Sequence, residues 1–266
     1  AGPRRGSSPP THRRTASPRC CGVTGAVIDQ MAFFPDGRRM VTTSDDHTVR
    51  LWDTATGESR VLEGHTDEAW SASISPSGRW LATSGRDKSI RVWDAATGEA
   101  RNAFTGLTTY ISVVHFVDED TLAASDDQAT AWIWDLRTGK SKVVAEKATF
   151  MGSPVSPDGK RLSIAGLHGE LFIHDVARGE LSRLESGSGS RIIATVFLPD
   201  GNTVASRSMD GTIRRWDLRT GKVEDLGGKM QSPKRWMRLS STCSSPRATA
   251  GTSPSPATTR PFASAT

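Results

Sequence analysis

The chain has 266 residues, a formal net charge of +5 and 35% hydrophobic residues, enough for one large domain or two small ones. The charge is uneven, because residues 1–24 carry five Arg and no acid, and residues 223–266 carry six basic and two acidic residues, which leaves about −4 for residues 25–222. The basic excess therefore lies at the two ends and gives no support to a nucleic-acid partner.

The sequence also argues against a membrane protein and against a cysteine-based site. No run of about 18 apolar residues is present, and the Arg- and Pro-rich start lacks the apolar stretch of a secretory signal. Cys20, Cys21 and Cys243 all lie near the ends, so residues 25–222 contain no cysteine for a disulfide or a metal. These features predict a cytoplasmic protein with no membrane partner.

A repeat of about 41 residues runs through the middle of the chain. Trp-Asp pairs recur at spacings of 41, 41, 40 and 42 residues when His174-Asp175 is counted in the place of one pair. A fixed period of this length indicates a repeat architecture such as a solenoid or a propeller. The four pairs are Trp52-Asp53, Trp93-Asp94, Trp134-Asp135 and Trp216-Asp217.

Each repeat contains the same local signals in the same order. A tight turn such as Pro-Asp-Gly at 35–37 or Pro-Ser-Gly at 76–78 separates the first two strands. Runs rich in β-branched residues, such as 48–52 and 89–93, end at the Trp, and a Thr-Gly turn follows. One unit therefore predicts a four-stranded antiparallel sheet, which needs neighbours on both faces.

Together with the pair Gly64-His65, this pattern resembles the WD40 repeat family. The resemblance implies an all-β fold, a WD40-type β-propeller of four-stranded antiparallel blades, with about five intact blades in an incomplete ring. The turn residues, Pro-Asp-Gly and Thr-Gly-Glu, are similar to those of bacterial WD40 arrays. The expected propeller covers residues 25–222, in units at 25–58, 59–99, 100–140, 141–180 and 181–222.

The two ends of the chain do not follow the repeat. Residues 1–24 are expected to be disordered or out of frame, and residues 223–266 form a low-complexity tail. The codons of residues 245–264 permit the middle of another repeat when read one base out of frame. We therefore interpret the chain as a fragment or frameshifted copy, with a scrambled sixth blade in the tail.

In blades of this family a His, a hydroxyl residue, an Asp and the Trp form a buried hydrogen-bonded tetrad. The resemblance assigns these roles in the second unit to His65, Thr83, Asp87 and Trp93. An Asp-His-hydroxyl set is also the composition of a catalytic triad. The structural role is favoured, because a catalytic site would not be expected three times in one ring. Three of the four members recur in the first unit as Thr42, Asp46 and Trp52, and in the fifth as Ser206, Asp210 and Trp216.

The third and fourth units depart from the tetrad pattern. The third has Leu107 in the place of the His and Ala124 in the place of the hydroxyl residue, and the fourth has Ile164 and His174 instead of a hydroxyl residue and the Trp. We expect these two blades to be locally weaker.

Two aromatic residues are candidates for binding a partner. Trp70 and Tyr110 stand where a loop enters the first strand of a unit, and aromatic residues dominate interface hot spots. The alternative is that either ring simply packs between blades.

No catalytic, cofactor-binding or metal-binding residues are expected, because the six His are scattered and no phosphate loop or paired catalytic carboxylates occur. The favoured function is a non-enzymatic scaffold for proteins or peptides, as the sensor or recruiting part of a larger bacterial signalling protein. The alternative is a propeller enzyme with a cofactor or metal over its central channel.

Overall fold

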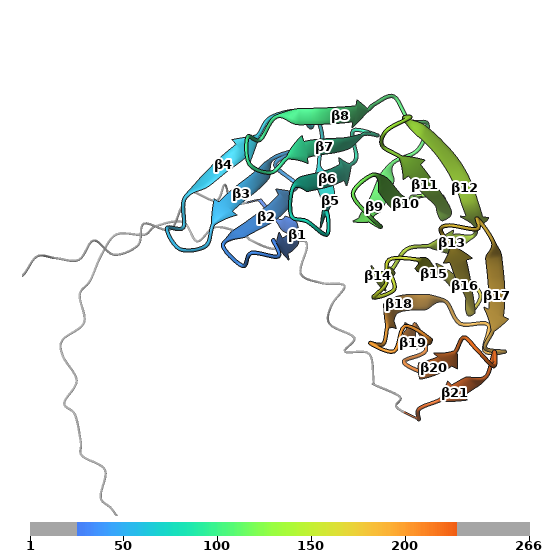
Figure 1. Ribbon diagram of the computed structural model, residues 1–266. Helices are drawn as coiled ribbons and strands as arrows, with labels where there is room; N and C mark the ends of the chain where they lie inside the picture. The colour runs from blue at the N-terminus through green and yellow to red at the C-terminus, as the bar shows by residue number, and fades with distance from the viewer. Residues whose placement is uncertain (1–25, 228–266) are drawn as a thin grey trace, which may run out of the picture. The chain divides into compact units, whose positions relative to one another are not determined.

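The computed structural model describes residues 26–227, and every regular element in that range is a β-strand. The strands form five sheets, in which strands that follow one another are paired in antiparallel fashion except for one parallel pair in the fifth sheet (Figure 1). No helix long and apolar enough to cross a membrane occurs within these residues. The expected disordered start at 1–24 and the frameshifted blade at 245–264 both lie outside the described residues.

The strand bounds are given sheet by sheet. The first sheet contains β1 (Ile28–Phe33), β2 (Arg39–Ser44), β3 (Val49–Asp53) and β4 (Ser59–Leu62), and the second contains β5 (Ala69–Ile74), β6 (Trp80–Gly85), β7 (Ile90–Asp94) and β8 (Ala100–Phe104). The third contains β9 (Ile111–Phe116), β10 (Thr121–Asp126), β11 (Thr130–Asp135) and β12 (Lys140–Glu146). The fourth contains β13 (Ala148–Thr149), β15 (Arg161–Gly166), β16 (Glu170–Asp175) and β17 (Leu181–Glu185), and the fifth contains β14 (Gly152–Ser153), β18 (Ile192–Phe197), β19 (Thr203–Ser208), β20 (Ile213–Asp217) and β21 (Val223–Asp225).

The Asp of each Trp-Asp pair holds the turn between the third and fourth strands of its sheet. In the first sheet an Asp53 carboxylate oxygen accepts hydrogen bonds from the backbone N–H groups of Ala55 and Thr56, at 2.8 and 2.9 Å. Gly57 closes the turn with a φ of +73°, a conformation that glycine adopts without strain. The repeated Asp and Gly are therefore explained by turn geometry and need no catalytic role.

The sequence repeat and the sheet are offset by one strand. The first expected unit ends at residue 58, whereas the outer strand of the first sheet, β4, runs from Ser59 to Leu62. The outer strand of the fifth sheet, β21, likewise runs from Val223 to Asp225, just beyond the expected end of the propeller. Each outer strand thus belongs in space to the unit that precedes it.

The hydrophobic core lies between successive sheets. We call the side of a sheet that is turned toward the preceding sheet its front face, and the side turned toward the next sheet its back face. In the second sheet Leu81 and Trp93 lie on the front face, where they cluster with Val41, Val49 and Leu51 on the back face of the first sheet. All five are at most 6% exposed, so each sheet is stabilised by the neighbour that covers it.

The same arrangement recurs at the next junction. Ala82 and Val92 on the back face of the second sheet cluster with Val114, Leu122 and Trp134 on the front face of the third. Two further clusters join the third sheet to the fourth and the fourth to the fifth. Four clusters thus connect five sheets in chain order.

The inner strand of the fourth sheet departs from the expected four-stranded pattern. It is split, because β13 stays in the fourth sheet, whereas β14 pairs in parallel with β18 of the fifth. Gly152 has a φ of +77°, and a Cβ on it would lie 2.5 Å from the carbonyl oxygen of Thr195. Pro154 has no N–H to donate to a ladder. These residues break the antiparallel strand and direct the chain toward the fifth sheet.

Removing one side chain from a junction should lower the stability of the chain. Leu122 is fully buried between the second and third sheets, so we expect Leu122→Ala to reduce the free energy of unfolding by about 2–5 kcal/mol. Denaturant unfolding measures this change. Leu181→Ala is the matched control, because Leu181 is 42% exposed and should change stability by less than about 0.5 kcal/mol. Equal losses for both variants would contradict a core that lies between the sheets.

Candidate interaction surface

A chain of hydrogen bonds joins the four residues expected to form the tetrad. His65 Nδ1 lies 2.9 Å from Asp87 Oδ2, and His65 Nε2 lies 2.8 Å from the Thr83 hydroxyl. Trp93 Nε1 donates to the same hydroxyl at 2.9 Å. The side chains of His65 and Asp87 are almost fully buried, so no route for a substrate reaches this set within the described structure.

Asp87 ties two loops together. Its carboxylate accepts hydrogen bonds from the hydroxyl and backbone N–H of Ser89, in its own turn, and from the backbone N–H of Thr66 in the loop before β5. Burial by itself raises the pKa of this carboxyl group, but the hydrogen bonds from His65 and Ser89 outweigh it and lower the pKa to about 2. The charged form of Asp87 thus fixes the β6–β7 turn against the β4–β5 loop.

The first and fifth sheets lack the His of the tetrad but keep the hydrogen bond from the Trp indole to the hydroxyl residue. Trp52 Nε1 donates to the Thr42 hydroxyl at 2.8 Å, and Trp216 Nε1 donates to the Ser206 hydroxyl at 2.7 Å. Asp46 and Asp210 each accept hydrogen bonds within their own turns, from Thr48 and Thr212 respectively.

The third and fourth sheets use other partners. In the third sheet Asp126 accepts hydrogen bonds from Trp132 Nε1 at 3.1 Å and from the Thr109 hydroxyl at 3.2 Å. In the fourth, His174 is buried, and this burial lowers its pKa. Its Nδ1 has no hydrogen-bond partner among the described residues.

The two candidate binding residues, Trp70 and Tyr110, lie against each other. Their ring centroids are 6.1 Å apart with an interplanar angle of 62°, an edge-on contact between two partly exposed rings. Trp70 Nε1 donates to Glu68 at 3.0 Å, which holds the indole in place. Residues 40 positions apart in the chain therefore form one aromatic surface at the junction of the second and third sheets.

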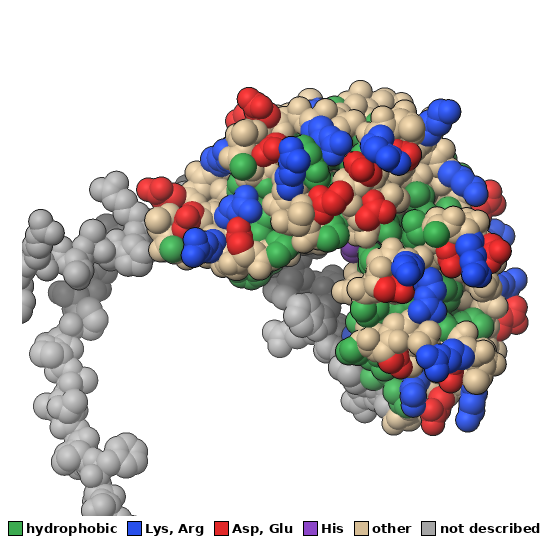
Figure 2. Space-filling view, in the orientation of Figure 1, with side chains coloured by type: hydrophobic (Ala, Val, Ile, Leu, Met, Phe, Trp, Pro, Cys, Tyr) green, Lys and Arg blue, Asp and Glu red, His purple; other side chains and the backbone are tan. Residues whose placement is uncertain are grey.

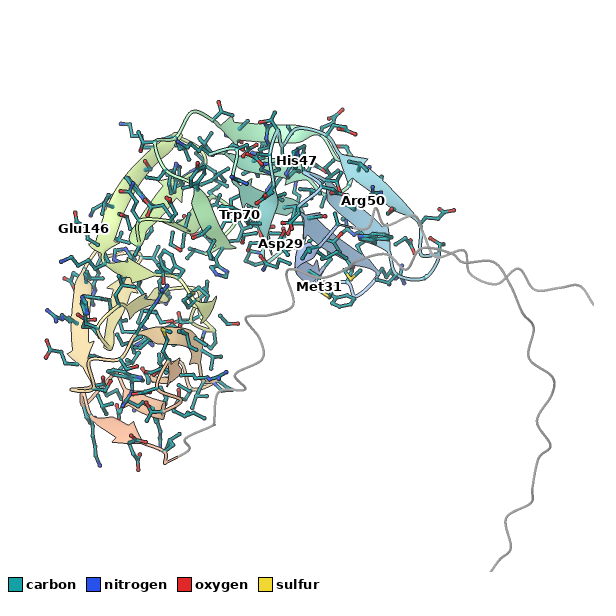
Figure 3. All side chains as sticks on the ribbon, turned by 180° about the vertical axis from the view of Figure 1, so that it is seen from behind. Asp29, Met31, His47, Arg50, Trp70 and Glu146 are labelled. Carbon is teal, nitrogen blue, oxygen red and sulfur yellow. The ribbon has the colours of Figure 1, made fainter. Side chains whose placement is uncertain are left out.

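Charged residues from the adjoining loops surround these rings. Lys88 Nζ lies 5.0 Å from the centroid of the Tyr110 ring, and Arg86 pairs with Glu68 at 2.9 Å. Figure 3 shows His47 and Trp70 in the same part of the molecule. We call this set the loop surface, and it comprises His47, Asp67, Glu68, Trp70, Arg86, Lys88 and Tyr110.

Two residues of the loop surface have an unusual backbone conformation. His47 and Lys88 have φ values of 69° and 57°, in the left-handed region that favours glycine. The same turn position holds Ala129 in the third sheet and glycine, Gly169 and Gly211, in the last two. Such a conformation costs a non-glycine residue about 1 kcal/mol or more, so His47 and Lys88 are placed on this surface at some expense of stability.

A pair of acidic residues lies beside the loop surface. Asp29 occupies a bulge in β1 and is labelled near Trp70 in Figure 3. Partial burial and the neighbouring carboxyl groups of Asp45 and Glu68 raise the pKa of Asp29 to about 7. This corner of the surface therefore carries negative charge that is not fully compensated.

A separate cavity of about 330 Å³ lies among the inner strands. Its lining includes Phe33, Ile74, His115 and Val155, from four successive sheets. Burial lowers the pKa of His115 to about 4, and its Nε2 has no hydrogen-bond partner within residues 26–227. In the same residues no group of three or more His, Cys, Asp or Glu side chains is arranged to hold a metal ion.

Comparison with known proteins agrees with this geometry. The WD40 family model, described as "WD domain, G-beta repeat", matches residues 19–53, 57–94 and 180–217. Three segments of the chain thus match WD40 repeats. The three matched segments contain the three sets of tetrad residues, one set in each.

Several curated proteins are similar to most of the chain. Autophagy-related protein 16 of Arabidopsis thaliana is 24% identical over 80% of this chain and 43% of its own length, and guanine nucleotide-binding protein subunit beta-5b of Danio rerio is 28% identical over 71% of this chain and 50% of its own. The chain thus spans about half the length of these relatives. The β-propeller domain of Myceliophteria thermophila Cps50 (Swd1) superposes with a TM-score of 0.63 at 19% identity, over 73% of this chain and 68% of that one, which shows a β-propeller fold.

The sequence alone does not single out the charged members of the loop surface. Lys88 could be found from the sequence, because it occupies a turn position where other repeats of this chain have glycine. Arg86 and Glu68 become recognisable only when the loops are brought together, since they lie 18 residues apart and in different connections.

Replacing Asp87 tests how far the tetrad stabilises the chain. We expect Asp87→Ala to lower the free energy of unfolding at pH 7 by about 1–3 kcal/mol, because it leaves buried donors without a partner. The Asp87 carboxyl has a lower pKa in the fold than its ordinary value of 3.8, so its contribution is complete above pH 3.8 and is lost as the pH falls toward 2. Denaturant unfolding of both proteins at several pH values measures this dependence.

Asp210→Ala is the control, because Asp210 holds the equivalent turn position but is 38% exposed at its side chain and has no His partner. We expect a loss below about 1 kcal/mol for this variant. Equal losses for the two variants would contradict a stabilising role of the buried network.

Proposed function

We propose that this chain is a non-enzymatic scaffold that binds a protein or peptide on the loop surface. The observation that carries the proposal is the edge-on contact of Trp70 and Tyr110, a rigid and partly exposed aromatic pair within a ring of charged side chains. Aromatic anchors with a polar rim are typical of binding hot spots. Asp87 holds the loop before Trp70 to the β6–β7 turn, and Asp127 accepts a hydrogen bond from the backbone N–H of Tyr110, so the surface is largely formed before a partner arrives.

The charges around the rings favour a partner with both apolar and basic side chains. An apolar side chain can pack against the exposed edges of Trp70 and Tyr110. A Lys or Arg of the partner can approach Asp29 and Asp45, where burial and the neighbouring carboxyl groups raise the pKa of Asp29. A short basic peptide with an aromatic or aliphatic residue meets both requirements.

We further propose that the chain acts in the cytoplasm, as the sensor or recruiting part of a larger bacterial signalling protein, and that it is a fragment or frameshifted copy of such a protein. The turn residues support the bacterial resemblance, and the absence of cysteine from residues 25–222 supports a cytoplasmic location. The relatives named above are eukaryotic and give no support to a bacterial origin. We also propose that it binds neither nucleic acid nor membrane, since charged side chains of both signs are interspersed on the face shown in Figure 2.

The alternative of a propeller enzyme lacks a supporting observation. A cofactor or metal over the central channel would need several polar ligands from different sheets. The lining of the cavity among the inner strands includes His115 as its ionisable side chain, together with apolar and Ser residues.

Peptide binding tests the proposed site. Peptides selected from a random displayed library on the wild-type chain should lose at least tenfold in affinity for Trp70→Ala and Tyr110→Ala, as expected for hot-spot residues. Fluorescence polarisation with a labelled selected peptide measures the affinity. Trp80→Ala is the control, because Trp80 is held between Arg79 and Arg101 at the opposite end of β6 and should leave binding unchanged. Unchanged binding by both loop-surface variants would refute the site.

A second pair of variants separates binding from stability. Lys88→Gly and Ala129→Gly both relieve a left-handed residue, so each should raise the free energy of unfolding by up to about 1 kcal/mol. Only Lys88→Gly should weaken the selected peptide, because Lys88 lies over Tyr110. If both variants bind like the wild type, Lys88 does not belong to the site.

A further inference from the structure

The front face of the first sheet is apolar and exposed. Ile28, Met31 and Phe33 on β1 are 39%, 59% and 63% exposed, and Met31 lies in Figure 3 on the side of the sheet that is turned away from the second. Trp52 on β3 is also only partly buried. No strand among the described residues packs closely against this face.

The same positions are buried in the sheets that follow. Trp52 aligns with Trp93, Trp134 and Trp216, which are at most 3% exposed because the preceding sheet covers them. Counting from the turn that follows the inner strand, Met31 and Phe33 correspond to positions that are buried at the later junctions. The counterparts of Met31 are Ala72, Val114 and Thr195, at most 2% exposed, and those of Phe33 include Phe116 and Phe197, at 5% and 7%. The exposed face therefore has the chemistry of a junction whose other face does not lie among residues 26–227.

The internal junctions show what kind of surface covers a front face. At each of them a front face is covered by the back face of another sheet, through aliphatic side chains such as Leu51 and Val92. The fifth sheet carries the one back face that the described sheets leave uncovered. It presents Val196, which is 43% exposed, together with Ala205 and Ile213.

Arginine is present on both free faces, since Arg50 lies on the front face of the first sheet, on the same side as Trp52. Arg215 stands on the back face of the fifth sheet where the earlier sheets have Leu51 or Val92, and Arg207 lies on the same face with an Nε that has no hydrogen-bond partner among residues 26–227.

Arginine also stacks on aromatic rings elsewhere in this chain. Arg39 lies 4.4 Å from the Phe34 ring, and Arg79 and Arg101 lie 4.4 and 4.3 Å from Trp80. The Arg215 side chain can therefore stack on a partly buried Trp.

We propose that two copies of this chain associate head to tail, with the back face of the fifth sheet of one copy against the front face of the first sheet of the other. The contact repeats the geometry of the internal junctions, with Val196 and Ile213 against Met31 and Phe33. Such a contact joins two different surfaces, so it leaves one free face at each end of a dimer and allows further copies to add.

Sedimentation of the full 266-residue chain over a wide concentration range tests the proposal. The wild type should form species larger than the 28.6 kDa monomer as the concentration rises. Phe33→Asp on the front face and Val196→Asp on the back face should each remain monomeric. Leu181→Asp is the matched control, since Leu181 is 42% exposed on an outer strand that belongs to neither face, and it should associate like the wild type. Circular dichroism establishes that all four proteins are folded.

Mixing the two monomeric variants distinguishes this contact from other arrangements. Phe33→Asp retains an intact back face and Val196→Asp an intact front face, so the mixture should form a dimer and nothing larger. A wild type that stays monomeric at every concentration would overturn the proposal, as would a mixture that stays monomeric. Self-association of Val196→Asp alone would show that front faces pair with each other, which also overturns it.

Discussion

The structure depends on one constraint, which is that a four-stranded sheet of this size cannot bury its own apolar faces. Each sheet is stabilised only where another sheet covers it, and four hydrophobic clusters between five sheets meet this need. The spacing of the repeat follows from this, because every unit must supply one front and one back face of the same size. The small residues at 72, 82 and 123, all Ala, let neighbouring sheets approach closely.

Polar groups inside such a stack are tolerated only when they are paired. His65, Thr83, Asp87 and Trp93 satisfy one another in the second sheet, and the hydroxyl–indole pair survives alone in the first and fifth. The third sheet replaces the arrangement with Asp126 and Trp132, so the turn is held by different atoms at the same place. Loop geometry, and with it the placement of Trp70 and Lys88, is thus a consequence of buried hydrogen bonding beneath the surface.

Much of this fold could be predicted from the sequence, because the period, the turn residues and the Trp-Asp pairs are local signals that most units repeat. The tetrad residues could be named from the resemblance to the WD40 family, and hydrogen bonds join His65, Thr83, Asp87 and Trp93 in the second sheet. The split inner strand at Gly152 could not be foreseen, since it depends on Thr195 of another sheet. The contact of Trp70 with Tyr110 was equally hidden, because one residue lies within a strand and the other in the loop before the next. The offset between unit and sheet arose because the outer strand has few distinctive residues.

The parallel pairing of β14 with β18 distinguishes one junction from the other three. Elsewhere, hydrogen bonds between strands of neighbouring sheets come from side chains, as when Ser71 and Ser73 accept from Val114 and Phe116. Between the fourth and fifth sheets, backbone groups bond directly to each other, because the backbone N–H of Thr195 donates to the carbonyl oxygen of Met151. Opening of one of these two sheets must break the backbone ladder of the other. The last two sheets should therefore behave as one foldon in native-state hydrogen exchange, whereas the first three can open singly from the free end.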